Sequence, residues 1–157
     1  MNAIDILVED HKTVEKLLEE LASTTDRAVK KRGDLLSRIE QELKVHTELE
    51  EQILYPALKE AGGKEEEKMY YEAKEEHRTV DSLVLPDLLH TETDTVEFAG
   101  RVKVMKELLE HHIEEEEGKF FPTAKKLLGK DVLDEMGLAM QEYKKTLKTQ
   151  HSAKQSI

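Results

Sequence analysis

The chain has 157 residues, of which 38% are hydrophobic and 38% are charged, and it carries a formal net charge of −11 at pH 7. This length suits a single domain, and the negative charge argues against binding to nucleic acid or to an anionic membrane surface, both of which attract lysine and arginine clusters. The absence of cysteine excludes disulfides and thiolate sites, and no apolar run approaches the roughly 20 residues that span a bilayer.

The first predicted helix begins near Asn2, which can cap it together with Asp5 three residues later. Apolar residues then recur at intervals of three and four, the spacing of a helix with one buried face. His11 occupies one position of this buried stripe, whose members are Ile4, Leu7, His11, Val14, Leu18 and Leu21.

The second predicted helix runs from about 26 to 61 and carries His46 and Glu50 on its buried stripe. Because these two residues are four apart, their side chains lie one above the other on the same face. Pro56 lacks a backbone N–H and is expected to bend the helix just past this pair. Gly62 and Gly63 then form a strong stop.

Three further helices follow in the same manner. The third runs from about 64 to 85 with His77 on its stripe, and Pro86 is expected to end or kink it. The fourth opens after a cap at Asp94 and carries His112 and Glu116 among apolar residues, with Pro122 beyond them. Gly129 is expected to break the chain before a fifth helix, which places Leu133, Met136, Met140, Tyr143 and Leu147 on one face.

The chain repeats itself at a constant offset. His77 follows His11, and His112 follows His46, by the same 66 residues, and Glu50 and Pro56 recur at that offset as Glu116 and Pro122. One helical pair used twice explains this register. We therefore predict an all-α, up-down-up-down four-helix bundle over residues 1–125. Residues 126–157 would form a short additional C-terminal helix and tail packed on the bundle.

Polar side chains lie on buried stripes where an ordinary bundle would carry leucine. A single histidine there is more often a hydrogen-bonded core residue than a ligand, but a buried glutamate costs several kcal/mol without a positive partner. No lysine or arginine lies on these stripes, so a metal pair is the simplest source of positive charge. The predicted ligands are His11, His46, Glu50, His77, His112 and Glu116.

This ligand set contains nitrogen and oxygen but no sulfur, which suits iron, manganese or zinc. Bundle cores commonly hold two such metals bridged by carboxylates. Two metals need about twelve donor positions, so roughly four positions would remain for oxo, hydroxo, water or a small molecule. We therefore expect a reactive site rather than a closed one.

The order His, His-x-x-x-Glu, His, His-x-x-x-Glu, with Tyr55-Pro56 and Phe121-Pro122 after the paired motifs, resembles the hemerythrin-like HHE cation-binding domain over about residues 3–125. The resemblance implies a four-helix bundle with a non-haem di-iron centre, oxo- or hydroxo-bridged. It also implies that the six residues predicted above are the iron ligands.

The chain departs from the oxygen-carrying hemerythrins, which have two histidines four apart on the third helix. Here Ala73 and Asp81 stand four residues before and after His77. The missing histidine leaves about two open positions, which favours turnover of peroxide, or reaction with O2 or NO, over reversible oxygen carriage. Tyr70 could send a phenol toward the gap, although an ordinary core tyrosine is the commoner case.

The assignment of the carboxylates also leaves alternatives. The oxygen carriers place their last carboxylate five residues after the histidine, where this chain has Glu117, and the repeat gives Glu51 the same place in the first half. The repeat favours Glu50 and Glu116, at plus four, as the ligands. His90, His111 and His151 lack repeat partners or stripe positions and are expected to be exposed.

The leading functional hypothesis is a di-iron protein that reacts with small oxidants, above all by catalase-like decomposition of hydrogen peroxide. The alternatives are O2, NO or iron binding or sensing without turnover, repair of iron centres, and a purely structural metal site. The expected partners are small molecules, with no nucleic acid and no membrane, and the expected state is a monomer or weak homo-oligomer. Because no secretory signal is visible, the expected location is the cytoplasm.

Overall fold

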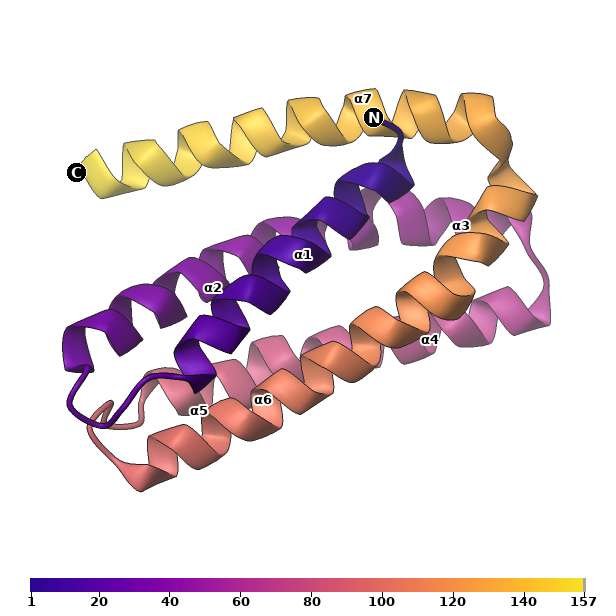
Figure 1. Cartoon of the computed structure of the whole chain (residues 1–157). Helices are drawn as coiled ribbons and strands as arrows, with labels where there is room; N and C mark the ends of the chain where they lie inside the picture. Colours follow the sequence, from indigo (N-terminus) through magenta and orange to yellow (C-terminus); the bar gives the residue numbers. More distant parts are fainter. Residues whose placement is uncertain (157) are drawn as a thin grey trace.

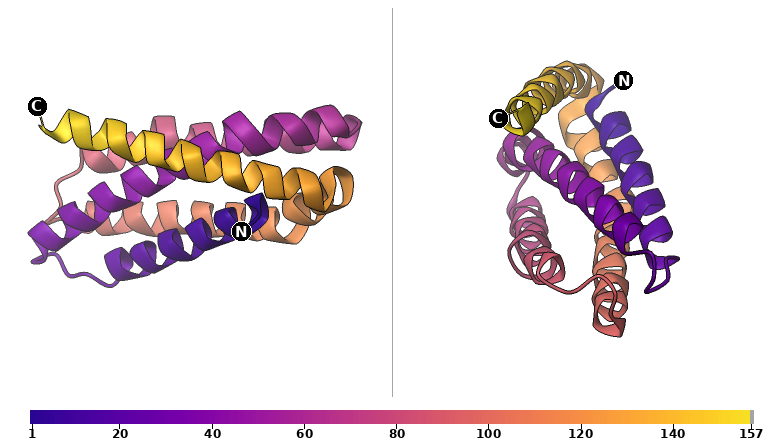
Figure 2. Two further views of the ribbon diagram at one scale, coloured as in Figure 1. Left: turned by 90° about the horizontal axis from the view of Figure 1, so that it is seen from above. Right: turned by 90° about the vertical axis from the view of Figure 1, so that its left-hand side faces the viewer.

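The computed structural model describes residues 1–156, with side chains up to Thr149, and the regular secondary structure in this part is helical. The long helices of the bundle run alternately up and down in Figure 1, and the end-on view of Figure 2 places them around a common centre. The predicted four-helix bundle is confirmed. In chain order, with η for a π-helical turn, the elements are α1 (Ala3–Ala22), α2 (Val29–Leu49), η1 (Glu50–Leu54), α3 (Tyr55–Ala61), α4 (Lys64–Arg78), η2 (Thr79–Val84), α5 (Leu85–Leu89), α6 (Val96–Glu115), η3 (Glu116–Phe120) and α7 (Phe121–Ser156).

The helix starts are set by local hydrogen bonds. The Asn2 side chain accepts a bond from the Asp5 N–H at 2.9 Å, and the Asp5 carboxylate accepts one from the Asn2 N–H at 3.1 Å, which is the predicted capping box. Helix α6 is capped by Thr95, whose hydroxyl accepts from the Phe98 N–H at 3.1 Å, and the predicted cap at Asp94 is one residue early.

The prolines do not end their helices. Each stands second in an α-helix that directly follows a π-helical turn, and the residues concerned are Pro56, Pro86 and Pro122. Proline lacks an N–H and its ring clashes with the carbonyl of an ideal preceding turn. The N–H just before each proline instead bonds five residues back, as from Tyr55 to Glu50. The wider turn admits the ring, so the helix continues past each proline instead of ending there.

The core consists of two apolar clusters separated by a polar layer. One cluster contains Leu7, Leu49 and Phe121, and the other contains Val14, Leu43 and Leu109. Along α1 the chain passes from the first cluster through His11 to the second, and the other long elements pass between the clusters in the same way at their own histidines. Each fully buried leucine contributes about 1.5–3 kcal/mol, so these clusters hold the polar layer in place.

The C-terminal helix is longer than expected. Its direction changes at Gly129, which has φ 79°, and the remainder runs back along the outside of α1 and α2 (Figure 1). Leu133 and Met140 are buried in the first cluster. A Cβ at Gly137 would lie 2.4 Å from the backbone oxygen of Met1, so glycine is what permits this close approach.

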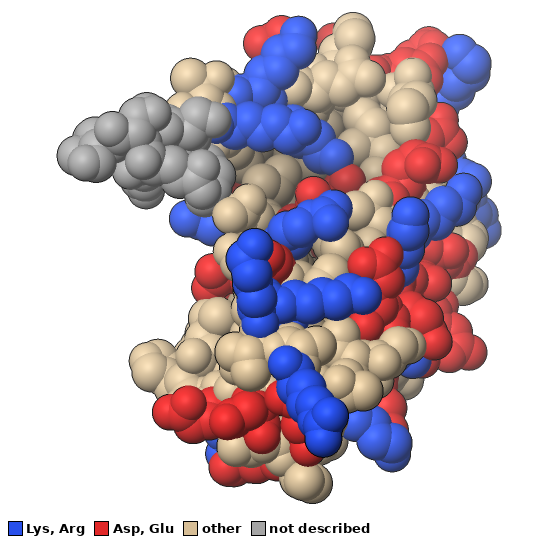
Figure 3. Space-filling model, turned by 60° about the vertical axis from the view of Figure 1, so that its left-hand side comes forward, with Lys and Arg blue, Asp and Glu red and all other residues tan. Residues whose placement is uncertain are grey.

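The surface mixes charges of both signs. Figure 3 shows lysine and arginine side chains crossing the middle of one face, with acidic side chains beside them. In the part of the chain that the structure describes, no helix is both long and apolar enough to cross a membrane.

Candidate metal centre

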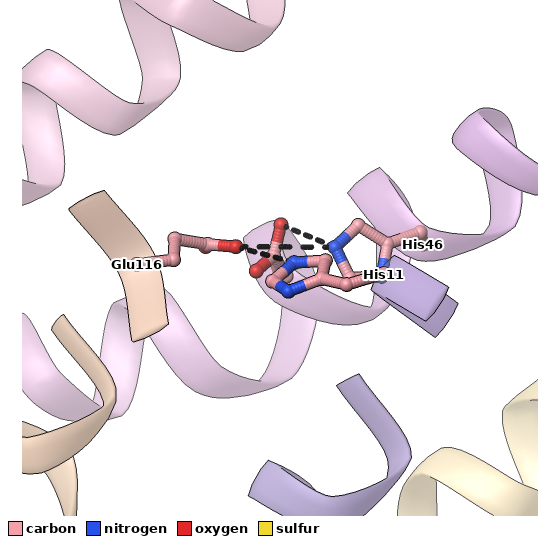
Figure 4. Close-up of side chains that lie close together, drawn as sticks. His11, His46 and Glu116 are labelled. Atoms are coloured by element: carbon pink, nitrogen blue, oxygen red, sulfur yellow. Dashed lines mark hydrogen bonds and ion pairs between the residues drawn. The ribbon is translucent and has the colours of Figure 1, made fainter. Parts of the chain in front are cut away.

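The residues predicted as ligands lie together in the polar layer. Their exposed fractions run from 0% for Glu50 to 7% for His77. Donor atoms of His11, His46, Glu50 and Glu116 lie within 4.8 Å of one another, and so do donor atoms of Glu50, His77 and His112. Figure 4 shows Glu116 reaching from one side toward the imidazoles of His11 and His46.

Each inner carboxylate lies between imidazoles from the two halves of the chain. Glu50 Oε1 is 3.1 Å from Nε2 of His46 and 3.1 Å from Nε2 of His77. Glu116 Oε1 is 2.9 Å from Nε2 of His11 and 3.5 Å from Nε2 of His112. This is the position that a bridging carboxylate takes between two cations in a bundle core.

Outer carboxylates hold the other nitrogen of each imidazole in the first half of the chain. Asp10 accepts a hydrogen bond from His46 Nδ1 at 3.0 Å, and Glu117 accepts one from His11 Nδ1 at 2.7 Å. An imidazole that donates from Nδ1 presents the lone pair of Nε2 to the opposite side. In the form that binds a cation, both rings therefore aim an acceptor nitrogen at the centre of the layer.

The second half of the chain repeats these bonds at the same offset. Glu76 accepts from His112 Nδ1 at 2.9 Å, and Glu51 accepts from His77 Nδ1 at 2.7 Å. These roles were not predicted from the sequence. They could have been found from their positions in the sequence, because each outer carboxylate directly precedes a histidine or directly follows an inner carboxylate of the repeat. The outer carboxylates are Asp10, Glu51, Glu76 and Glu117.

The π-helical turns explain how consecutive glutamates serve one site. Glu50 and Glu116, at plus four, lie in the centre, while Glu51 and Glu117, at plus five, bond to the outer edges of the imidazoles. Neighbouring side chains of an α-helix point about 100° apart. A π-helical turn begins at each inner carboxylate, and its greater width brings the following residue toward the same layer.

The donor set fits a cation. Nε2 of His46, Nε2 of His112 and both carboxylate oxygens of Glu50 are buried without a hydrogen-bond partner. Each such atom costs about 1–3 kcal/mol when nothing satisfies it. Metal ions in the two groups of donors would satisfy all of these atoms, and a mixed set of imidazole and carboxylate donors suits iron, manganese or zinc.

The electrostatics of the layer favour positive charge among the imidazoles. Burial disfavours the charged form of His77, but the close carboxylates of Glu50 and Glu51 outweigh burial and raise its pKa to about 10. Burial also disfavours charge on Glu50, yet the neighbouring imidazoles, above all that of His46, hold the pKa of this carboxyl well below the usual range. Protons and metal ions therefore compete for the same place.

Tyr55 is a site residue that the sequence analysis missed. Its hydroxyl donates to Glu116 Oε2 at 2.5 Å and lies 3.4 Å from His77 Nε2, while its ring stacks on His77. Burial and the charge of Glu116 raise the pKa of this phenol well above 10, so it keeps its proton at neutral pH. Tyr70, the residue that was considered, packs against the ring of Tyr55 at 6.5 Å between centroids. The missed signal was the Tyr-Pro pair itself.

Two cavities adjoin the layer. A small one of about 30 Å³ is lined by Ala73, His112 and Glu116, on the side where the oxygen carriers would place a further histidine. A larger one of about 130 Å³ is lined by the four histidines of the layer and by apolar residues such as Val80 and Leu109. His111 lies at the edge of the larger cavity and is exposed, as is His90, whereas His151 lies outside the described side chains.

Comparisons with known proteins agree with this arrangement. The Hemerythrin HHE cation binding domain matches residues 2–124, which include the whole polar layer. A crystal structure of a hemerythrin HHE cation-binding domain-containing protein from Mycobacterium kansasii is 26% identical, with a TM-score of 0.84 over 98% of this chain and 91% of that one.

A curated relative differs in size. The DNA nickase of Nostoc sp. is 25% identical over 131 residues, which are 83% of this chain, and the match covers 36% of that protein. The chain thus spans about a third of the length of this relative. The domain match covers most of the chain and contains the buried histidines and glutamates described above. The chain therefore belongs to the hemerythrin HHE cation-binding domain family.

Proposed function

We propose that this protein is a non-haem di-iron protein that decomposes hydrogen peroxide. The observation that carries the proposal is the set of buried donor atoms without partners at the centre of a duplicated site. His11 and His46 would hold one ion, His77 and His112 would hold the other, and Glu50 and Glu116 would lie between them. Manganese and zinc suit the same donors, and elemental analysis would distinguish them.

The surrounding residues support chemistry on a small oxidant. When bound, a pair of redox-active ions would supply and recover the electrons that convert two peroxide molecules into water and dioxygen. The Tyr55 hydroxyl keeps its proton and donates a hydrogen bond to Glu116 Oε2 at 2.5 Å, at the edge of the site. A proton held at this position can be delivered to a departing oxygen and regained afterwards, which is general acid and base catalysis.

The size of the space at the missing histidine favours a very small substrate. The cavity of about 30 Å³ beside Ala73 exceeds the 10–15 Å³ or so that one water molecule needs. Phe120 and Met69 also line it, and the space suits a molecule near that size. Hydrogen peroxide fits this space.

Oxygen evolution from hydrogen peroxide by the iron-loaded protein tests the proposal. We expect about two irons per chain and a rate well above that of the same concentration of free iron. Glu50→Gln is the matched control, because it keeps the shape of the side chain and removes the charge between the two imidazoles. A rate no better than free iron, with two irons bound, would contradict peroxide turnover.

Binding of O2 or NO without turnover is the second candidate. The cavity of about 130 Å³ supports it, because its lining is mainly apolar and includes the edges of the buried histidines. Spectral changes that reverse when O2 or NO is removed, with no net oxidation of the iron, would favour this function. Steady release of dioxygen from peroxide would favour the first.

A further inference from the structure

The C-terminal helix reaches the metal centre through one lysine. Lys144 Nζ lies 2.5 Å from Asp10 Oδ1, while Asp10 Oδ2 accepts the hydrogen bond from His46 Nδ1 at 3.0 Å. The Asp10 side chain is only 8% exposed and that of Lys144 is 27% exposed, so this charge pair is largely shielded from solvent. A residue 134 positions away in the chain thus acts on a carboxylate that orients a candidate ligand.

The second half of the chain lacks this cation in the described structure. Glu76 bonds to His112 as Asp10 bonds to His46, but its side chain is 37% exposed. Among the described residues, no lysine or arginine forms an ion pair with Glu76. The 66-residue repeat ends early in α7, and the part of this helix that carries Lys144 has no counterpart in the first half, so it covers only one of the two equivalent positions.

Neighbouring contacts fix Lys144 in place. The Tyr143 hydroxyl donates to Glu48 Oε2 at 3.0 Å, which ties the same turn of α7 to α2. Met140, one turn earlier, is fully buried, and Gly137 lies against the backbone of Met1. The turn of α7 that carries Lys144 is therefore fixed against the bundle, which keeps the ammonium group of Lys144 beside Asp10.

We propose that Lys144 makes the two cation positions unequal, so that the position of His11 and His46 binds a divalent cation more weakly than the position of His77 and His112. A carboxylate bonded to Nδ1 increases the basicity of a metal-binding imidazole. Lys144 draws the Asp10 carboxylate toward itself and offsets its charge, so His46 receives less of this support than His112 receives from Glu76. The inference rests on the proposed site for two cations.

Titration of the metal-free, full-length protein with Co²⁺, followed by its visible absorption, tests this proposal. In the wild type we expect two resolved binding steps. In Lys144→Met the weaker step should become about tenfold tighter, so that the two steps merge. Lys144→Arg keeps the cation and should stay within about twofold of the wild type. An unchanged or weakened second step in Lys144→Met would overturn the proposal, since a purely orienting lysine would weaken it.

Two controls separate this effect from a general change in charge. Lys145→Met removes a lysine that is 77% exposed and pairs with Glu142, and it should leave both steps unchanged. If Lys144 acts through Asp10, Lys144→Met should have no effect in an Asp10→Asn background. An equal shift in Lys145→Met, or an undiminished shift with Asn at position 10, would contradict the mechanism. Failure to bind two Co²⁺ ions would instead count against the proposed di-metal site.

Discussion

In the first half of the chain His46 bonds to a buried carboxylate that also binds a lysine, whereas in the second half His112 bonds to Glu76, which faces solvent. The rings that cover the site differ in the same manner. Phe121 stacks on His11 at 5.6 Å, and its repeat counterpart Tyr55 stacks on His77 at 5.4 Å with a hydroxyl directed at Glu116. The duplicated unit has thus kept its donors and outer carboxylates while the residues around them have diverged. The halves are alike in what they can bind and different in how they can react.

Removing one histidine from either half is expected to have the largest effect. His46→Ala and His112→Ala should each reduce the metal content from about two ions per chain to about one, because each takes a nitrogen from one position only. Elemental analysis of protein purified by size exclusion measures this directly. Loss of both ions in one variant and of neither in the other would show that the halves do not bind independently.

Removing the phenol should separate binding from turnover. Tyr55→Phe gives the first half of the chain the ring that the second half has at Phe121, and we expect peroxide turnover to fall about 100-fold with metal content unchanged, because the hydroxyl that donates to Glu116 is lost. Tyr70→Phe is the matched control, since Tyr70 packs on Tyr55 and should leave the rate unchanged. Equal losses in both variants would indicate a packing effect.

Neutralising the outer carboxylates compares the two halves more finely. Asp10→Asn and Glu76→Gln should each weaken one cation-binding step by about 10-fold or more. Asp10→Asn should also cost about 1 kcal/mol in urea unfolding of the metal-free protein, because Lys144 loses its charged partner in a largely shielded place. If Glu76→Gln destabilises the metal-free protein as much, the buried lysine pair does not distinguish the halves.

Proton release is the smallest expected signal. A free imidazole is neutral at pH 8, but His77 in the metal-free protein has a pKa of about 10 and stays protonated, so a binding cation must expel that proton. Calorimetric titrations in two buffers of different ionisation enthalpy should therefore give different heats. Glu51→Gln removes one of the bonds that raise this pKa and should reduce the difference. Equal heats in both buffers for the wild type would contradict proton release.

The positions of the candidate ligands were predictable because two independent signals agree. Helical periodicity places His46 and Glu50 on one buried face, and the 66-residue offset places His112 and Glu116 at the same height in the second half. The fold follows from the same apolar stripes. Neither signal depends on side-chain geometry, so both can be read from the sequence alone.

The surroundings of the site were not predictable in the same way. Glu117 stands in a run of glutamates that resembles a solvated face, and only the position of α1 shows that it bonds to His11. Each π-helical turn shifts the positions of the following side chains around the helix by one residue, and the spacing of apolar residues does not reveal this shift. Proline indicates only that the regular α-helix is disturbed nearby. Lys144 lies outside the repeat, so its contact with Asp10 depends on how α7 folds back.

The π-helical turns at Glu50 and Glu116 also determine where the backbone hydrogen bonds are expected to open most easily. The backbone bonds of such a turn are less favourable than those of an α-helix, and the proline that follows removes one more donor. These short segments are therefore expected to exchange their amide hydrogens with deuterated water faster than the flanking helices do. A cation held between the two glutamates would connect both weak segments and slow that exchange. The exchange rate of these backbone amides would therefore report whether the centre holds a cation.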